Sequence, residues 1–178
     1  PTGGGKSITF QVPGLMLPGL TLVVTPLISL MKDQVDRLRA QGIRAAAIHS
    51  GMGPEQMQHT LDNCLWGGYK FLYISPERLA SASFLSWLQE ARISLLAVDE
   101  CHCISQWGYD FRPSYLNILE LRRLYPELPI LALTATATEE TIGEILSVLD
   151  FRPGYAFLRK SFLRPQLSYS IRRCEDKS

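Results

Sequence analysis

The sequence predicts an α/β fold in which a mainly parallel sheet is covered by helices on both faces. Short apolar runs alternate with segments whose apolar residues recur at helical spacing, the pattern of alternating strands and helices. One run, residues 93–98, is apolar enough for a strand buried on both faces, and it leads directly into the acids Asp99 and Glu100. The chain also opens with a glycine-rich stretch, Pro1–Ser7, that ends in Lys-Ser.

Up to residue 74 we expect helix and strand to alternate. The expected elements are a helix over 7–17 bent at Pro13, a strand over 21–25, a helix over 27–42, a strand over 45–48, a helix over 54–66 and a strand over 71–74. In the second helix, Asp33 and Arg37 are spaced to pair on the polar face. Gly42 suits the end of that helix, and Pro54 suits the start of the next one.

The second half of the chain continues the alternation. The expected elements are a helical segment over 76–91 in one or two pieces, the strand over 93–98, a helix over 115–125, a strand over 129–134, a helix over 139–149 and a last strand over 155–158. The carboxyl ends of parallel strands share one rim of the sheet, where open α/β folds bind ligands. Segments that follow the strands are therefore the candidate site.

Composition excludes several classes of protein. A chain of 178 residues suits one α/β domain, and a net charge of +1 does not indicate a globally basic nucleic-acid binder. No apolar run is long enough to span a membrane and no signal-peptide pattern precedes Pro1, so we expect no membrane contact and a cytoplasmic protein, nucleoid-associated in a bacterium or nuclear in a eukaryote. The cysteines Cys64, Cys101, Cys103 and Cys174 lack paired zinc-site spacing, which predicts reduced thiols and no zinc.

Residues 1–7 match the phosphate-binding loop G-x-x-x-x-G-K-[ST] in all but its first position. The residues that would cradle phosphate oxygens through backbone N–H groups are Thr2, Gly3, Gly4 and Gly5. Lys6 would reach the β- and γ-phosphates, and Ser7 would bind Mg²⁺ together with Asp99. Glu100 would orient or deprotonate a water. The alternatives are a flexible glycine-rich terminus and a strand that merely ends in Asp-Glu. The presence of both the glycine-rich Lys-Ser motif and the Asp-Glu pair favours a nucleoside triphosphate site.

Three strand-to-helix segments share the rim with Lys6 and Asp99: residues 25–34, 73–79 and 132–138. They offer hydroxyls, backbone N–H groups and cations, the groups that hold phosphodiester oxygens. The candidates are Lys32, Ser75, Arg78, Thr134 and Thr136. Each segment alone could be an ordinary loop, and Ser75 could simply cap a helix. Three together favour a nucleic-acid track.

Residues 104–113 form a polar loop rich in aromatic residues and interrupted by glycine and proline. Trp107 and Phe111 are natural stacking groups, because an aromatic face accepts any base. Gln106 and Arg112 would add polar and cationic contacts. Core packing is the alternative for the two aromatic side chains, and the lack of helical or strand periodicity argues against it.

The motifs Pro1–Ser7, Thr25–Gln34, Tyr73–Leu79, Asp99–Pro113 and Leu133–Thr138 closely resemble the first motor domain of the RecQ family of DNA helicases, in helicase superfamily 2. The resemblance implies a RecA-like fold and an ATP- and Mg²⁺-dependent enzyme that moves 3′ to 5′ on single-stranded DNA and unwinds duplexes in repair and recombination. It also implies that His102 links the nucleotide site to DNA, that residues 104–113 sense single-stranded DNA, and that Thr134 and Thr136 couple hydrolysis to movement.

The chain departs from the family pattern in several places. Cys101 stands where alanine is usual, Tyr109 where histidine is common, and Leu163 where aspartate is common. We expect residues 1–160 to be the first motor domain, with the strand before its phosphate loop missing, and 161–178 to begin a connection to a second motor domain. A fragment of this kind should have negligible activity alone. Another superfamily 2 ATPase, for instance one acting on RNA, and a non-catalytic nucleotide- or DNA-binding remnant are the alternatives.

Overall fold

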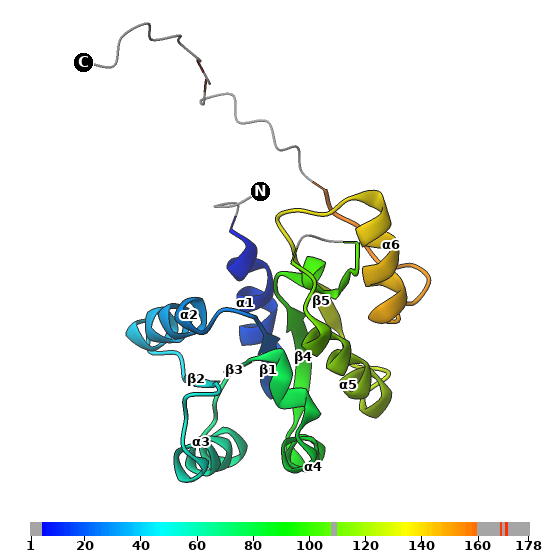
Figure 1. Cartoon of the computed structure of the whole chain (residues 1–178). Helices are drawn as coiled ribbons and strands as arrows, with labels where there is room; N and C mark the ends of the chain where they lie inside the picture. Colours follow the sequence, from blue (N-terminus) through cyan, green and yellow to red (C-terminus); the bar gives the residue numbers. More distant parts are fainter. Residues whose placement is uncertain (1–4, 108–109, 160–167, 169, 171–178) are drawn as a thin grey trace, which may run out of the picture.

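Within the residues that the structure describes, five parallel strands form one sheet with the order β2-β3-β1-β4-β5. The strands are β1 (Leu20–Val24), β2 (Ala45–Ile48), β3 (Phe71–Ile74), β4 (Ile93–Val98) and β5 (Ile130–Ala132). The computed structural model describes residues 5–107, 110–159, 168 and 170. Figure 1 shows the sheet at the centre of the chain with helices on both sides.

Along the chain, helices alternate with the strands, as the sequence pattern predicts. The α-helices are α1 (Lys6–Met16), α2 (Ile28–Ala40), α3 (Pro54–Trp66), α4 (Ala82–Glu90), α5 (Ile118–Leu124) and α6 (Glu139–Val148), and the 3₁₀ helices are η1 (Pro76–Ala80), η2 (Cys101–Ile104) and η3 (Pro113–Asn117). Helix α1 continues through Pro13, and the segment from 76 to 90 is helical in two pieces. Ser81 separates those pieces and accepts a hydrogen bond from the Phe84 amide, 3.4 Å. None of the described helices is long and apolar enough to cross a membrane.

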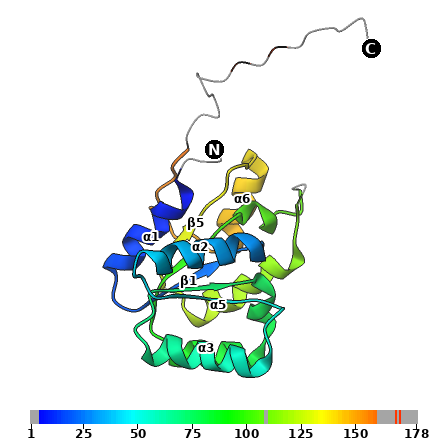
Figure 2. The ribbon, with the colours of Figure 1, turned by 90° about the vertical axis from the view of Figure 1, so that its left-hand side faces the viewer.

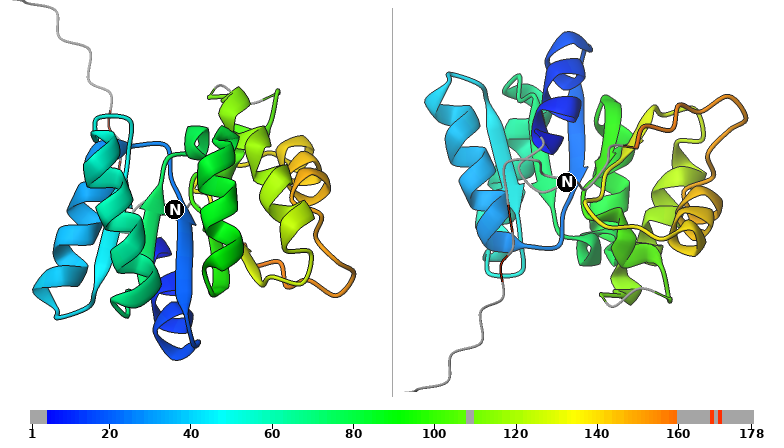
Figure 3. Two further views of the ribbon diagram at one scale, coloured as in Figure 1. Left: turned by 90° about the horizontal axis from the view of Figure 1, so that it is seen from below. Right: turned by 90° about the horizontal axis from the view of Figure 1, so that it is seen from above.

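The sheet is buried on both faces because its side chains alternate between two apolar layers. In β1, Val23 faces a layer completed by Phe10 of α1 and Met31 of α2. Leu22 and Val24 face the opposite layer, which α3, α4, α5 and α6 complete. Figure 2 shows α2 and α3 on opposite sides of the sheet. Seen from below, α3 (teal) and α4 (green) lie side by side (Figure 3), where Trp87 donates to the carbonyl of Leu61, 3.2 Å.

The order of the strands brings the candidate segments together. Strand β1 pairs with β3 on one side and with β4 on the other, so residues that follow 24, 74 and 98 leave the sheet at neighbouring points of one rim. Helix α1 begins at the same rim, because Lys6 contacts the acids that follow β4. The parallel sheet flanked by helices is confirmed.

Some expectations about the elements are wrong or differ in detail. Residues 155–158 form no strand; Phe157 and Leu158 are exposed, and no described strand pairs with them. The helix expected over 115–125 consists of η3 and the shorter α5. In the described part of the sheet, every strand pairs directly with its neighbours, and β2 and β5 form the edges. The strand expected before the phosphate loop stays a prediction. The connection expected over 161–178 lies almost entirely outside the described residues.

Candidate active site

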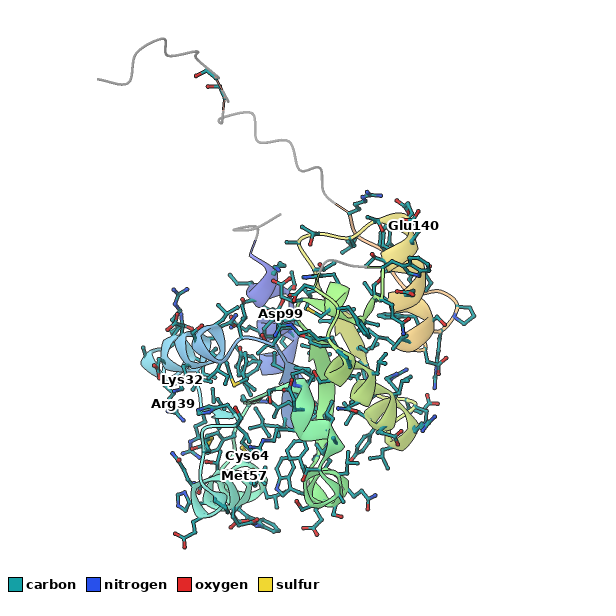
Figure 4. All side chains as sticks on the ribbon, in the orientation of Figure 1. Lys32, Arg39, Met57, Cys64, Asp99 and Glu140 are labelled. Atoms are coloured by element: carbon teal, nitrogen blue, oxygen red, sulfur yellow. The ribbon has the colours of Figure 1, made fainter. Side chains whose placement is uncertain are left out.

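Lys6, Asp99 and Glu100 meet at the carboxyl ends of the strands. Lys6 Nζ lies 2.6 Å from Glu100 Oε1 and 3.8 Å from Asp99 Oδ1. Figure 4 places Asp99 close to the first turn of α1, which Lys6 begins. Gly5 precedes Lys6 with φ +77°, a left-handed conformation that favours glycine, and no atom of the described residues lies within 4 Å of the place its Cβ would take. A helix start with a lysine attracts anions.

Asp99 is held rigidly in a buried position. Its amide donates to the carbonyl of Val24, 2.9 Å, and its carbonyl accepts from the hydroxyl of Tyr115, 2.8 Å. The residue is only 5% exposed, and burial raises the pKa of its carboxyl group although Lys6 acts against the shift. A buried carboxylate with a raised pKa gains from a nearby cation, so Asp99 is suited to bind a divalent metal ion.

Glu100 adopts a left-handed conformation, φ 47° and ψ 43°, which is strained for a residue with a side chain. This backbone turn directs its carboxylate between two partners: Lys6, and His102 Nδ1 at 3.3 Å from Oε2. His102 Nδ1 also lies 2.8 Å from the hydroxyl of Thr134. The Thr134 hydroxyl donates to the carbonyl of Thr136, 2.9 Å, so it accepts from His102, whose Nδ1 carries the proton. Glu100, His102, Thr134 and Thr136 thus form one connected chain of contacts.

Ser7 is positioned by a side chain that the sequence did not single out. Gln34 of α2 donates through Nε2 to Ser7 Oγ, 3.0 Å, and accepts through Oε1 from the hydroxyl of Tyr73, 3.0 Å. Tyr73 is 1% exposed, so it anchors the amide to the core. Gln34 is the last residue of one candidate segment and Tyr73 the first of another, and spacing alone does not show that they meet.

A cationic hollow lies along the edge strand β2, between α2 and α3. This cavity of about 440 Å³ is lined by residues of α2, β2, the following loop and α3, including the cations Lys32 and Arg39, the acid Asp36, and His49 at the carboxyl end of β2. Arg78 donates to the carbonyl of His49, 3.2 Å, and burial together with the charges of Lys32 and Arg78 lowers the pKa of the His49 ring. Figure 4 shows Lys32 and Arg39 on α2. His49 directly follows strand β2, so the expectation that residues after a strand form the site also applies to it.

The aromatic loop is anchored at several points. The Gln106 amide donates to Glu144 Oε2 of α6, 3.1 Å, and the Arg112 amide donates to the carbonyl of Cys103, 2.9 Å. Trp107 is 80% exposed, whereas Phe111 is half-buried and the Arg112 guanidinium pairs with Asp110 at 3.3 Å. An exposed indole on an anchored loop is available for stacking.

The structure therefore brings together Lys6, Ser7, Asp99, Glu100, His102, Thr134 and Thr136 at one rim, with Lys32 and Arg78 farther along it. Ser75 is 6% exposed, so its side chain is largely covered. The predicted phosphate-loop residues Thr2, Gly3 and Gly4 and the variant position Tyr109 lie outside the described residues. Glu144, Gln34 and Tyr115 support the site without having been predicted.

Residues 1–145 match a known protein family, described as DEAD/DEAH box helicase. The chain belongs to the DEAD/DEAH box helicase family. Among its relatives it is 47% identical over 178 residues to the ATP-dependent DNA helicase RecQ of Bacillus subtilis, covering 99% of this chain and 30% of the relative. It is 45% identical to RecQ of Haemophilus influenzae, covering 96% of this chain and 27% of that protein, and 41% identical to the rat ATP-dependent DNA helicase Q1, covering 97% and 29%.

These identities confirm the resemblance to RecQ helicases, and the chain spans about a third or less of the relatives' length. Helicases of this family use ATP. Among solved structures, the helicase domain of Pyrococcus furiosus Hef matches with a TM-score of 0.63 at 20% identity, covering 84% of this chain and 32% of the helicase-domain chain. A hypothetical ATP-dependent RNA helicase from Sulfolobus tokodaii gives a TM-score of 0.63 at 20% identity, covering 88% and 45%. At these identities the two structures support the helicase fold alone.

Proposed function

We propose that this chain is the ATP-binding motor domain of a RecQ-type DNA helicase, which couples Mg²⁺-dependent ATP hydrolysis to 3′-to-5′ movement on single-stranded DNA and to duplex unwinding. The observation that carries the proposal is the convergence of the phosphate-loop lysine Lys6 on Asp99 and Glu100, at 3.8 and 2.6 Å, on the rim where parallel sheets bind ligands. The full reaction would require a second motor domain in the same protein.

The residues fit a Mg²⁺-nucleotide complex by their chemistry. The Ser7 hydroxyl and the Asp99 carboxylate are oxygen ligands of the kind Mg²⁺ prefers, and the bound ion would neutralise phosphate charge. Lys6 would exchange its contact with Glu100 for phosphate oxygens. Glu100 would then be free to orient a water and hold its proton, while it keeps its contact with His102.

Nucleic acid would bind along the same rim. Lys32 and Arg78 supply positive charge around the cationic hollow, and phosphate oxygens are the natural partners of such groups. Trp107 would stack on a base, which contributes about 1–3 kcal/mol. Thr136 contacts Thr134, Thr134 contacts His102, and His102 contacts Glu100, so a change at the DNA side would reach Glu100 through a continuous set of contacts.

Isothermal titration calorimetry tests the nucleotide site. The chain should bind ATP in the presence of Mg²⁺, and Lys6→Ala should lower the affinity at least about tenfold, or about 1.4 kcal/mol. Lys70→Ala is the matched control, because Lys70 donates to the carbonyl of Leu17 and makes no contact with the acids. Equal affinities of wild type and Lys6→Ala would refute the assignment of the site.

The coupling of DNA binding to hydrolysis is tested in a longer chain that includes a second motor domain. Glu100→Gln should abolish hydrolysis and leave ATP binding largely intact. Trp107→Ala should reduce stimulation by single-stranded DNA more than basal turnover, whereas Trp66→Ala, which removes an indole that is 86% exposed on α3, should change neither. Stronger stimulation by RNA than by DNA would favour an RNA-dependent ATPase, and an inactive two-domain chain would favour a non-catalytic remnant.

A further inference from the structure

Three side chains that could act as metal ligands meet beside the nucleotide site, at the junction of η2 with the aromatic loop. Cys103 Sγ lies 3.9 Å from His102 Nε2 and 3.5 Å from Asp110 Oδ2. One ligand atom from each residue lies within 4.8 Å of the other two. None of these atoms has a role in the proposed ATP chemistry, which uses Nδ1 of His102.

The distances suit a tetrahedral cation. With Zn–S near 2.3 Å and Zn–N and Zn–O near 2.0–2.2 Å, the sulfur atom should lie about 3.6 Å from the nitrogen and oxygen ligands. The observed S–O distance of 3.5 Å already matches, and the S–N distance of 3.9 Å requires a small closing movement. Because the Asp110 side chain is 52% exposed, its carboxylate can move to complete the geometry.

The hydrogen-bond partners of His102 leave Nε2 available as a ligand. Its Nδ1 carries the ring proton, because the Thr134 hydroxyl already donates to the carbonyl of Thr136 and Glu100 Oε2 is also an acceptor. In the neutral imidazole, Nε2 is then the nitrogen with the free lone pair, and it faces Cys103 Sγ. Metal-binding histidines are commonly oriented in this way, with the second ring nitrogen donating to a carboxylate or another acceptor.

The neighbouring charges permit binding. Arg112 contacts Asp110 through Nε to Oδ1 at 3.3 Å and through a second nitrogen to Oδ2 at 3.4 Å, so a cation would compete for Oδ2 while the Oδ1 contact remains. Burial, with the charge of Asp110 adding to it, raises the pKa of the Cys103 thiol to about 12, so the thiol is protonated until a metal ion binds. The proton would leave to solvent as the metal–sulfur bond forms.

We propose that His102 Nε2, Cys103 Sγ and Asp110 Oδ2 form a binding site for a thiophilic divalent cation of the zinc class, with one position open to water. The sulfur and nitrogen ligands exclude Mg²⁺, which prefers oxygen. This site is separate from the oxygen ligands Ser7 and Asp99. An ion bound there would tie the aromatic loop to η2 through Asp110, next to the histidine that contacts Glu100.

Cobalt(II) is the probe, because a cobalt–thiolate bond absorbs in the near ultraviolet. Titration of the 178-residue chain should produce this band, saturate at one ion per chain, and be reversed by Zn²⁺ but not by excess Mg²⁺. A variant with Cys64, Cys101 and Cys174 replaced by Ser should retain the band, whereas Cys103→Ser should lose it. Absence of the band in the folded wild-type chain, or its persistence in Cys103→Ser, would overturn the proposal.

Two further pairs of variants keep the test decisive if Cys103→Ser does not fold. Asp110→Asn should weaken cobalt binding at least tenfold, and Asp62→Asn, at an exposed position on α3, should leave it unchanged. His102→Asn should also weaken binding, while His59→Asn, on the exposed surface of α3, should not. Equal effects within either pair would show that cobalt binds elsewhere. The readout is binding alone, so it is independent of whether the chain hydrolyses ATP.

Discussion

Replacing Tyr115 by Phe removes one hydroxyl and tests whether the backbone of Asp99 must be held in place. Tyr115 is fully buried, and its hydroxyl donates to the carbonyl of Asp99 at 2.8 Å. The loss of this bond, together with a buried carbonyl left without that donor, should cost about 1–2 kcal/mol. For a chain of this size the melting temperature should fall by about 2–8 °C. No cavity larger than one oxygen atom forms, so packing contributes little.

The effect on the site separates a positioning role from a structural one. If Tyr115 holds Asp99 for the metal ion, Tyr115→Phe should weaken Mg²⁺-dependent ADP binding by about threefold to tenfold, equal to about 0.7–1.4 kcal/mol. Tyr125→Phe is the matched control, since its hydroxyl donates to the carbonyl of Leu88 away from the rim. Calorimetry with and without Mg²⁺ measures the affinity, and circular dichroism measures the melting temperature. An unchanged Mg²⁺-dependent affinity in Tyr115→Phe, or an equal loss in Tyr125→Phe, would refute the reasoning.

Three other substitutions give further tests. Asp99→Asn should raise the melting temperature at pH 7 and abolish the effect of Mg²⁺ on nucleotide binding. Burial raises the pKa of Asp99, so its ionised form destabilises the fold. The gain in melting temperature should therefore disappear as the pH falls below the unfolded-state pKa of about 3.9. Gln34→Leu should weaken Mg²⁺-dependent ATP binding about threefold to tenfold, because Ser7 loses its hydrogen bond, whereas Gln58→Leu on α3 should not; equal affinities by calorimetry would contradict this. Arg122→Met should destabilise the chain by about 3 kcal/mol in urea unfolding, because the buried guanidinium donates to the carbonyls of Leu128 and Leu149, both at 3.0 Å; a loss below about 1 kcal/mol would show that these bonds are dispensable.

The sequence by itself determined the order and type of most elements, because these depend on local patterns. Apolar runs such as residues 93–98 are too short for helices and too apolar for loops, and they are strands in the structure. The parallel arrangement then required the acids after β4 and the helix after the phosphate loop to share one rim, so the meeting of Lys6 with Asp99 and Glu100 was predictable from topology.

The strand predicted over residues 155–158, which does not form, shows what a local sequence pattern cannot predict. Residues 155–158 contain side chains that suit a strand, yet a strand forms only where a neighbouring chain accepts and donates its backbone hydrogen bonds. In the described part of the chain this segment follows a turn, where the amide of Tyr155 donates to the carbonyl of Arg152, and Leu158 is 94% exposed. Whether a partner strand is in reach depends on the path of the whole chain.

Only the tertiary structure decided which side chains around the predicted residues touch one another. Gln34 reaches Ser7 from another helix, and Tyr115 reaches back to Asp99 across the aromatic loop. Linear spacing gave no zinc pattern, yet the path from η2 through the loop brings Asp110 back to Cys103. Such contacts depend on where a loop returns and which way each side chain points. The path of a loop and the direction of a side chain are set by packing against the rest of the fold, so they cannot be predicted from local sequence patterns.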